Sequence, residues 1–479
     1  MHLPGTPHSS RHLLSLFAST LLLTLVACAN PEPDPVTSID GGSDPVIDAG
    51  TDTDGGTESD GGLDTDGGSD TDGGQGSFTA TFELQFGTAQ DDVLNGVVAA
   101  EDGTVFGFGF AGGSQDKEND GPIGAADAVV VKRAPGAAGV QQFRLSSAGN
   151  ATDSFESALI EDGTLTLVGR TRGAFPPAVN AGKFDTFVAK MGGEGTFASG
   201  VMQFGDERSQ HPRNLLRTSN GGLAVSGYNE IYVPTNYVEA YEDPTLAFLT
   251  GSGTAESPWA IGRDLRFDTP ITDFALGAVA AKDDSGDVFV ARYHSGGTKR
   301  GAWVIRYSPS GDVVWERILS GGLYDSANAL AIAPTGELVV AGSGFRKFVK
   351  SYGGQDVFVL WLDPVTGDLL RSAQAGGTEA DWTHAIAVDA RGHVFVAGYT
   401  LGDVAASNSG EADLMLLEFD ASGAWVRGWQ DGTAGWDELA GIALLPSGEL
   451  VVTGSTTSEF VAGQRVGGWD ALMLQLAPR

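Results

Sequence analysis

The chain has 479 residues, a formal net charge of −34 and a single cysteine. Such a negative charge opposes binding to nucleic acid or to anionic lipid faces, so neither is an expected partner. One thiol excludes an intramolecular disulfide framework and a zinc site made of cysteines. Length alone predicts about three domains, a count that the repeats described below replace.

Residues 1–27 are typical of a targeting segment. Arg11 and the nearby histidines make a weakly basic start, and residues 13–27 form an apolar run too short to span a bilayer comfortably. The run ends in LVAC at residues 25–28, which resembles the lipobox of a bacterial lipoprotein signal. That resemblance implies cleavage before Cys28, acylation of Cys28 and, with Ala29 next, anchoring in the outer membrane. An ordinary secretory signal is the alternative.

Residues 28–76 are predicted to be the acylated cysteine and a disordered linker. Residues 29–76 hold 11 Asp and 2 Glu, no Lys or Arg, and many glycines, so the segment should be flexible and extended. Residues 52–55 (DTDG) resemble the start of an EF-hand loop, but Gly56 stands where a third ligand belongs. At most weak Ca²⁺ binding is expected, and no other cofactor. Without these 13 acids and Arg11, the formal net charge changes from −34 to −22.

Residues 77–479 repeat one unit, which is clearest at His384–Thr400. The apolar run 385–388 predicts a buried strand, and Asp389–Gly392 has the composition of a hairpin turn. Residues 393–399 form a second, β-branched and aromatic strand, in which Gly398 leaves room for a neighbouring backbone. Third and fourth strands are predicted at residues 413–419 and 424–429.

This unit occurs seven times with a spacing close to 57 residues, apart from a shifted fourth copy. The second strands end at Gly109, Gly169, Gly227, Arg292, Gly342, Gly398 and Gly454. The third strands begin at Asp127, Asp185, Asp243, Gly301, Asp356, Asp413 and Asp470. A four-stranded unit at this period predicts an all-β fold, a seven-bladed β-propeller of antiparallel blades.

The pattern GGT-x3-D-x3-AIAVD-x2-G-x-VFVAG, at residues 376–398, resembles the bacterial SBBP-type β-propeller repeat. The resemblance extends over roughly residues 78–479 and is weakest in copies three and four. Relatives with this repeat are mostly extracytoplasmic proteins of undefined activity. The resemblance therefore implies a fold, but little chemistry.

The two ends of the repeat region predict how the ring closes. The last copy stops after its third strand, residues 471–476, while an extra strand, Phe78–Phe86, precedes the first copy. We expect this N-terminal strand to complete the last blade, which would remove the exposed edge of an open ring.

Catalytic signatures are missing, so no catalytic residue and no metal ligand are predicted. The sequence has no HExxH, no G-x-S-x-G and no Walker A loop. Residues 107–112 match G-x-G-x-x-G, but no helix follows, and the glycines are interpreted as strand residues. An enzyme would need a carboxylate pair or a His/Tyr/Arg cluster at the channel mouth.

Six aspartates lie ten to thirteen residues before a hairpin glycine, in the segment leading into each inner strand. They are Asp92, Asp153, Asp273, Asp325, Asp381 and Asp437. Such a ring at the channel mouth could hold a cation or a basic ligand. The favoured interpretation is structural, in which each carboxylate accepts backbone N–H groups of its own loop.

The longest connections join second to third strands, and long loops on a rigid scaffold commonly bind ligands. In copy three this predicted loop, residues 228–241, carries four candidate ligand-binding tyrosines: Tyr228, Tyr232, Tyr237 and Tyr241. Their rings suit sugars or peptides, and Glu230 and Glu239 could accept hydrogen bonds from ligand hydroxyls. The alternative is that the rings pack on the blades beneath.

The predicted function is an outer-membrane-tethered binding or scaffolding module for an extracytoplasmic polysaccharide or protein. A propeller enzyme, such as a polysaccharide lyase or hydrolase, and a purely structural envelope protein are the alternatives.

Overall fold

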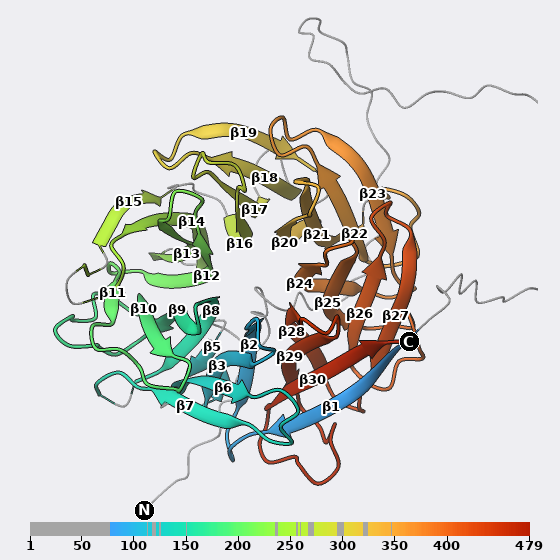
Figure 1. The fold of residues 1–479 in the computed structure, drawn as a ribbon, viewed down its shortest axis with the longest axis horizontal. Coiled ribbons are helices and arrows are strands. Elements are labelled where there is room, and N and C mark those ends of the chain that lie inside the picture. The colour runs from blue at the N-terminus through green and yellow to red at the C-terminus, as the bar shows by residue number, and fades with distance from the viewer. Residues whose placement is uncertain are drawn as a thin grey trace, which may run out of the picture. The chain divides into compact units, whose positions relative to one another are not determined.

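The computed structural model describes residues 77–479 except 113, 117–120, 124–125, 150, 235–237, 255–256, 259, 267–272, 295–300, 320–323 and 346. Seven four-stranded antiparallel sheets surround a central axis as the blades of a β-propeller (Figure 1). The predicted seven-bladed, all-β fold is therefore confirmed. Residues 1–76, with the predicted signal, Cys28 and the linker, lie outside the described residues. Among the residues that are described, no helix is long and apolar enough to cross a membrane.

The strands of each blade follow one another in sequence, from the inner strand outward, except in blade 7. Blade 1 contains β2 (Asp92–Ala99), β3 (Val105–Ala111), β6 (Asp127–Arg133) and β7 (Gln141–Leu145). Blade 2 contains β8 (Asp153–Glu161), β9 (Thr164–Thr171), β10 (Asp185–Gly192) and β11 (Met202–Phe204). Blade 3 contains β12 (Ser209–Arg217), β13 (Leu223–Pro234), β14 (Val238–Thr250) and β15 (Ala260–Arg266). Blade 4 contains β16 (Asp273–Ala280), β17 (Val288–His294), β18 (Gly301–Tyr307) and β19 (Val313–Ile318).

Blades 5 to 7 contain the most regular copies of the repeat. Blade 5 contains β20 (Ser326–Ile332), β21 (Leu338–Gly344), β22 (Asp356–Leu362) and β23 (Leu369–Ala375). Blade 6 contains β24 (Asp381–Val388), β25 (Val394–Thr400), β26 (Asp413–Phe419) and β27 (Trp425–Asp431). Blade 7 contains β28 (Asp437–Leu444), β29 (Leu450–Thr456), β30 (Asp470–Pro478) and the N-terminal β1 (Phe78–Phe86). A short hairpin, β4 (Ser114–Asp116) with β5 (Gly121–Ile123), extends from blade 1.

The second and third strands form the core, because neighbouring blades cover both of their faces. Every residue of β25 and β26 is buried, which explains why these strands are apolar runs and not alternating ones. Side chains of Val396 and Met415 pack with Val339 and Trp361 of blade 5 in one cluster. Burial of this kind joins each blade to the next, so a single blade could not form the core alone.

A glycine two residues before the end of the second strand lies opposite a β-bulge in the inner strand of most blades. In blade 6 the register between β24 and β25 shifts between Thr383 and Ala385. The bulge brings the carbonyl oxygen of Trp382 so close to Gly398 that a Cβ atom at this position would overlap it. The predicted close approach of a neighbouring backbone at Gly398 is thus confirmed.

The N-terminal strand closes the ring, as predicted. β1 pairs antiparallel with β30, from Phe78 opposite Pro478 to Phe86 opposite Ala471, and lies at the outer edge of blade 7 (Figure 1). Gln85 of β1 donates from Nε2 to Asp470 Oδ2 at 2.8 Å, and its Oε1 accepts the N–H groups of Phe460 and Val461. The same pairing of a fourth-strand glutamine with a third-strand aspartate occurs within blades 2, 5 and 6, as Gln203 with Asp185, Gln374 with Asp356 and Gln430 with Asp413.

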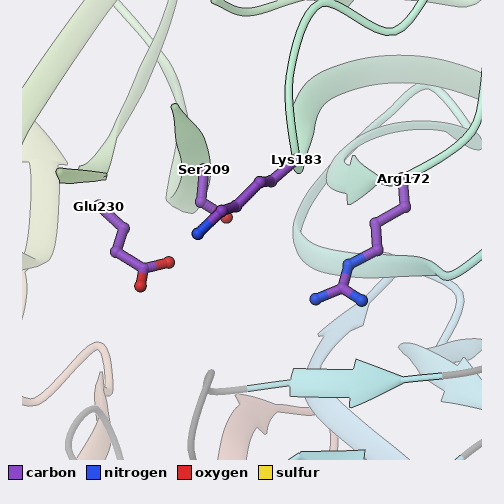
Figure 2. Close-up of a pocket in the computed structure, with 4 residues that line it drawn as sticks. All are labelled: Arg172, Lys183, Ser209 and Glu230. Atoms are coloured by element: carbon purple, nitrogen blue, oxygen red, sulfur yellow. The ribbon is translucent and has the colours of Figure 1, made fainter. Parts of the chain in front are cut away.

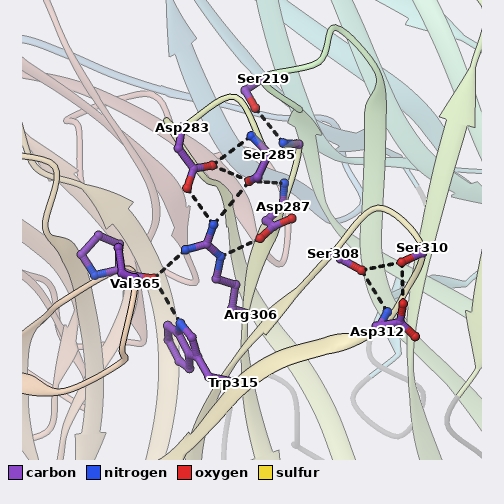
Figure 3. Close-up of polar contacts among 12 residues, drawn as sticks. Ser219, Asp283, Ser285, Asp287, Arg306, Ser308, Ser310, Asp312, Trp315 and Val365 are labelled. Carbon is purple, nitrogen blue, oxygen red and sulfur yellow. Dashed lines mark hydrogen bonds and ion pairs between the residues drawn. The ribbon is translucent and has the colours of Figure 1, made fainter.

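A buried arginine joins the irregular blades 3 and 4 to blade 5 on the side of the hairpin turns (Figure 3). Arg306 of β18 lies 2.7 Å from carboxylate oxygens of both Asp283 and Asp287. Its Nη1 donates to the carbonyl oxygen of Pro364 in blade 5, 2.9 Å away. In the same turn as the two aspartates, the N–H of Gly286 donates to Ser219 Oγ of blade 3. Arg306 thus ties blade 4 to blade 5, and the turn that carries its two aspartates is also hydrogen-bonded to blade 3.

We expect Gln85→Ala to destabilise the ring, because it leaves the carboxylate of Asp470 and two backbone N–H groups without their amide partner. Loss of these buried hydrogen bonds should lower the free energy of unfolding by about 2–3 kcal/mol. Gln142→Ala, at an exposed position of β7, is the matched control. Chemical denaturation measures the free energy of unfolding of the two variants. Equal stability of the two variants would contradict closure through Gln85.

Candidate ligand site

A cavity of about 390 Å³ opens between blades 2 and 3 and is lined by Arg172, Lys183, Ser209 and Glu230 (Figure 2). Arg172 directly follows β9, Lys183 lies just before β10, and Ser209 begins β12. These positions all lie where the second-to-third strand connections meet the starts of the inner strands. The cavity is therefore on the face at which long connections predicted a ligand site.

Two local features bring these side chains together. The connection between β9 and β10, residues 172–184, carries both cations at its two ends. In blade 3, β13 has 12 residues where β25 of blade 6 has 7, and it continues outward past the usual end of the second strand. Glu230 lies in this extension and pairs with Ser209 in the register of β12 and β13.

A chain of buried polar groups supports Glu230 from beneath. Arg170 Nε lies 3.1 Å from Glu156 Oε1, and its Nη1 lies 2.6 Å from His211 Nδ1. Because an arginine can only donate, His211 accepts at Nδ1 and carries its proton on Nε2. This Nε2 lies 3.8 Å from Glu230 Oε2. The network crosses the junction between blades 2 and 3 and ends beside the carboxylate of Glu230.

Aromatic packing keeps the middle of this network away from solvent. The imidazole of His211 stacks on the ring of Tyr228, with centroids 4.7 Å apart and planes 8° from parallel. Arg213 donates from Nη2 to the hydroxyl oxygen of Tyr228. His211 is 4% exposed and Tyr228 is 2% exposed, so neither ring reaches a ligand in the cavity. Both rings lie beneath Glu230 in the packing between blades 2 and 3.

Two cations and one carboxylate line the cavity. The pKa of Glu230 is lowered, first by the hydrogen-bonding interaction with His211 and further by the charges of Lys183 and Arg172, against the opposing effect of burial. Glu230 is therefore ionised at neutral pH and acts only as a hydrogen-bond acceptor. The site combines exposed cations at Arg172 and Lys183 with one fixed carboxylate.

Five of the six predicted aspartates have described side chains, and all five are buried. Asp92, Asp153, Asp325, Asp381 and Asp437 are at most 2% exposed. Each accepts a backbone N–H near its own inner strand, from Thr88, Ser147, Phe345, Gly377 and Thr433 respectively. Asp273 lies in β16, and its side chain is outside the described part of the chain. Blade 3 has Gln210 at the corresponding place.

The tyrosine-rich segment predicted as a loop is a β-hairpin instead. Strands β13 and β14 pair through it, from Tyr228 opposite Pro244 to Pro234 opposite Val238. The prediction of a loop was wrong because its β-branched and aromatic residues continue the ladder. Tyr228 is buried against His211, while the side chains of Tyr232, Tyr237 and Tyr241 lie outside the described residues.

A second group of side chains lies on the same face of the propeller, at blades 6 and 7. Trp382, at the start of β24, and Trp436, just before β28, are both half-buried. Both are near the ring of buried Tyr399, with centroids 6.2 Å and 5.1 Å from it. Trp436 donates from its indole N–H to Glu438 Oε2 at 2.9 Å. The two tryptophans offer apolar faces beside polar groups.

Sequence reasoning had named Glu230 as an acceptor for ligand hydroxyls, but it missed Arg172 and Lys183. Their position in the sequence could have indicated them, because both lie in a second-to-third strand connection. Cations are also scarce in this chain, which has 28 Lys and Arg against 62 Asp and Glu. Their proximity to Glu230 depends on the packing of blade 2 against blade 3.

Residues 371–404 match the family model described as "SBBP: Beta-propeller repeat". This segment runs from β23 of blade 5 to just past β25 of blade 6, and the match supports the predicted propeller repeat. No curated protein matches the chain.

Several solved structures have a similar arrangement at low identity. A protein of unknown function from Dyadobacter fermentans is 11% identical with a TM-score of 0.45, covering 84% of this chain and 100% of that one. The WD40 β-propeller domain of Doa1 is 11% identical with a TM-score of 0.44, covering 83% and 97%. The phage phi92 endosialidase is 9% identical with a TM-score of 0.46, covering 84% and 69%. Similarity at this level says nothing about activity.

The aspartate ring predicts a pH dependence of stability. Burial raises the pKa of Asp381 to about 7, although hydrogen bonds from Thr400 and Gly377 oppose the shift. The folded state then binds a proton that the unfolded state releases near pH 4, so stability falls as the pH rises from about 4 to about 7. Asp381→Asn should reduce this fall, because the amide is neutral throughout and its oxygen still accepts.

Melting temperatures at pH 4.5 and pH 7.5 test this expectation, and the difference between them should shrink by a few degrees in Asp381→Asn. Asp389→Asn is the control. At Asp389, partial burial is outweighed by hydrogen bonds from Arg391 and His393, so its pKa is lowered and it stays ionised in this range. An unchanged difference in Asp381→Asn would show that Asp381 is ionised at pH 4.5.

Proposed function

We propose that the protein is a β-propeller binding module, held at the outer membrane through acylated Cys28, whose extracytoplasmic ligand enters the cavity between blades 2 and 3. The observation that carries this proposal is the cavity itself, where Arg172, Lys183 and Glu230 converge on one space of about 390 Å³. This volume lies in the usual range for ligand sites, roughly 300–1,000 Å³.

Preorganisation supports a binding role. The Glu156–Arg170–His211 network ends 3.8 Å from the carboxylate of Glu230, and each lining residue lies in a strand or within two residues of one. A site that is already ordered loses little conformational entropy when its ligand binds.

A polysaccharide suits this face better than a protein. The four side chains that line the cavity are polar or charged, and a carboxylate that only accepts matches hydroxyl donors. The half-buried rings of Trp382 and Trp436 on the same face offer surfaces on which sugar rings stack. A long glycan is able to use both features, since they belong to the same face of one rigid ring.

A His/Tyr/Arg cluster, which a lyase would need, does occur at the cavity, as His211, Tyr228 and Arg170. Its burial argues against catalysis, because a general acid or base has to come within hydrogen-bond reach of its substrate. The cluster is better suited to positioning Glu230, and binding without turnover is the function we propose.

The anchor is tested by Cys28→Ser. Because Cys28 is the only thiol of the chain, this change should release the protein from the membrane fraction or block its processing. Membrane fractionation and the mass of the mature protein measure the effect. Unchanged partition and mass would contradict anchoring through Cys28.

The ligand site is tested by capture from envelope and polysaccharide fractions with residues 77–479. The double variant Arg172→Gln with Lys183→Gln should capture at least tenfold less of the bound polysaccharide, because both cations line the cavity. Lys347→Gln, an exposed cation in the corresponding connection of blade 5, is the control and should capture as the wild type does. Equal capture by all three proteins would place the ligand elsewhere.

A further inference from the structure

We infer that the connection between β21 and β22 of blade 5 is a membrane-contact surface that touches an anionic lipid bilayer. This connection, residues 345–355, has the sequence FRKFVKSYGGQ. It belongs to the face of the propeller on which the second-to-third strand connections lie. The inference goes beyond the proposed function, because it uses neither the cavity between blades 2 and 3 nor the acylation of Cys28.

Hydrogen bonds and one aromatic contact hold this connection against its own blade. The backbone N–H groups of Phe348 and Val349 donate to Gln374 Oε1, at 2.9 Å and 3.1 Å. The ring of Phe348 packs on that of Phe358, with centroids 4.8 Å apart. Because Phe348 packs inward, its two neighbours in sequence, Lys347 and Val349, are held at the surface, where both are exposed.

Three apolar or aromatic side chains are exposed at this place. Phe345 is 48% exposed and Val349 is 53% exposed, and Tyr324, just before the inner strand of the blade, is 40% exposed. The rings of Tyr324 and Phe345 form an edge-to-face pair with centroids 6.1 Å apart. Such a group leaves apolar surface in water that a partner is able to cover.

Two exposed lysines stand beside this apolar group. Within the part of the chain that the structure describes, neither Lys347 nor Lys350 forms an ion pair. The ammonium of Lys350 lies 4.9 Å from the centroid of the Tyr352 ring, a contact that leaves its charge in place. The connection therefore presents positive charge on an acidic protein.

The positive charge distinguishes blade 5 from the two regular blades that follow it. In all three blades a fourth-strand glutamine accepts a backbone N–H of this connection, which aligns the three segments. The residue just before that N–H is Lys347 in blade 5, Asp403 in blade 6 and Glu459 in blade 7. The shared contact thus forms equally with an acid at this position, so the fold itself does not require the lysine.

An anionic bilayer matches this combination of groups. Basic side chains are attracted to anionic headgroups, while exposed apolar side chains enter the boundary between headgroups and acyl chains. Three exposed apolar side chains are few for a stable protein interface, which buries roughly 800 Å² on each partner. Contact with lipid has no such minimum area.

The charge of the whole propeller limits the contact to this place. The acidic remainder of the ring repels an anionic surface, but salt screens that repulsion beyond about 8 Å at physiological ionic strength. Blade 5 lies across the ring from blade 2 (Figure 1). A propeller that touches the bilayer with blade 5 therefore keeps the cavity between blades 2 and 3 on the side away from that contact.

Co-sedimentation with lipid vesicles tests the inference, using residues 77–479, which contain all seven blades and the closing strand. Vesicles of phosphatidylcholine with about a third of phosphatidylglycerol should bind the protein at millimolar lipid, and phosphatidylcholine alone about tenfold more weakly. Lys347→Gln with Lys350→Gln should weaken binding to the anionic vesicles about 25-fold, since each lysine near such a surface contributes about fivefold. Lys282→Gln, an exposed lysine on the side of the hairpin turns, is the control and should bind as the wild type does.

Phe345→Ser tests the apolar part of the surface separately. Loss of this ring should weaken binding to the anionic vesicles about fivefold, because less apolar surface leaves water on contact. Leu369→Ser is the matched control, since Leu369 is 54% exposed in the outer strand of the same blade. Melting temperatures check that every variant folds.

Equal binding to the two kinds of vesicle, or binding to neither, would overturn the inference. Binding to anionic vesicles that persists unchanged in the double lysine variant and in Phe345→Ser would also overturn it, because the contact would lie elsewhere on the propeller. Retention of an envelope protein that depends on Lys347, without binding to vesicles, would assign this surface to a protein partner and overturn the lipid surface. None of these outcomes bears on the cavity or on Cys28, which have their own tests.

Discussion

The architecture depends on one junction, repeated around the ring, where the chain enters an inner strand. In four blades the inner strand begins with an aspartate whose backbone N–H donates to a carbonyl oxygen of the preceding blade. The acceptor is the residue just before the third strand of that blade. The pairs are Asp92 with Trp469, Asp153 with Ala126, Asp381 with Gln355, and Asp437 with Ala412. The carboxylate of the same residue turns inward and accepts loop N–H groups, so one residue fixes both the loop and the neighbouring blade. Burying each carboxylate has a cost, visible as the raised pKa of Asp92, Asp153, Asp381 and Asp437. These hydrogen bonds offset the cost because they leave few loop groups unpaired.

Closure uses a second recurring interaction, between the third and fourth strands. Gln203, Gln374 and Gln430 each bond a third-strand aspartate of their own blade, and Gln85 does so for Asp470, more than 380 residues away in sequence. The ring is therefore closed by the same contact that completes an ordinary blade. An open blade 7 would expose both the edge of β30 and the buried carboxylate of Asp470, so the closed ring is strongly preferred.

The candidate ligand site lies where the repeat is least regular. Blade 3 replaces the junction aspartate with Gln210, whose N–H still donates to the carbonyl of Phe184, so the junction survives without a buried charge. The space beside it is filled by the Glu156–Arg170–His211 network, and the extended β13 carries Glu230 to the surface. Regular blades keep the ring rigid, and one altered junction accommodates a polar cavity. This division agrees with the general observation that binding sites depart from the local rules of their scaffold.

The sequence by itself determined the seven blades, most strand positions, the closing strand and the ring of aspartates, because these features repeat and each copy supports the others. Only the tertiary structure decided which polar residues share a cavity. Arg172 and Glu230 lie 58 residues apart and belong to different blades, and no short-range pattern connects them. The extended hairpin was missed for a related reason, since its composition permits loop and strand alike and only pairing between β13 and β14 selects the strand. Periodic burial leaves a signal in the chain, whereas a contact made once, between two blades, depends on packing geometry that a single sequence does not display.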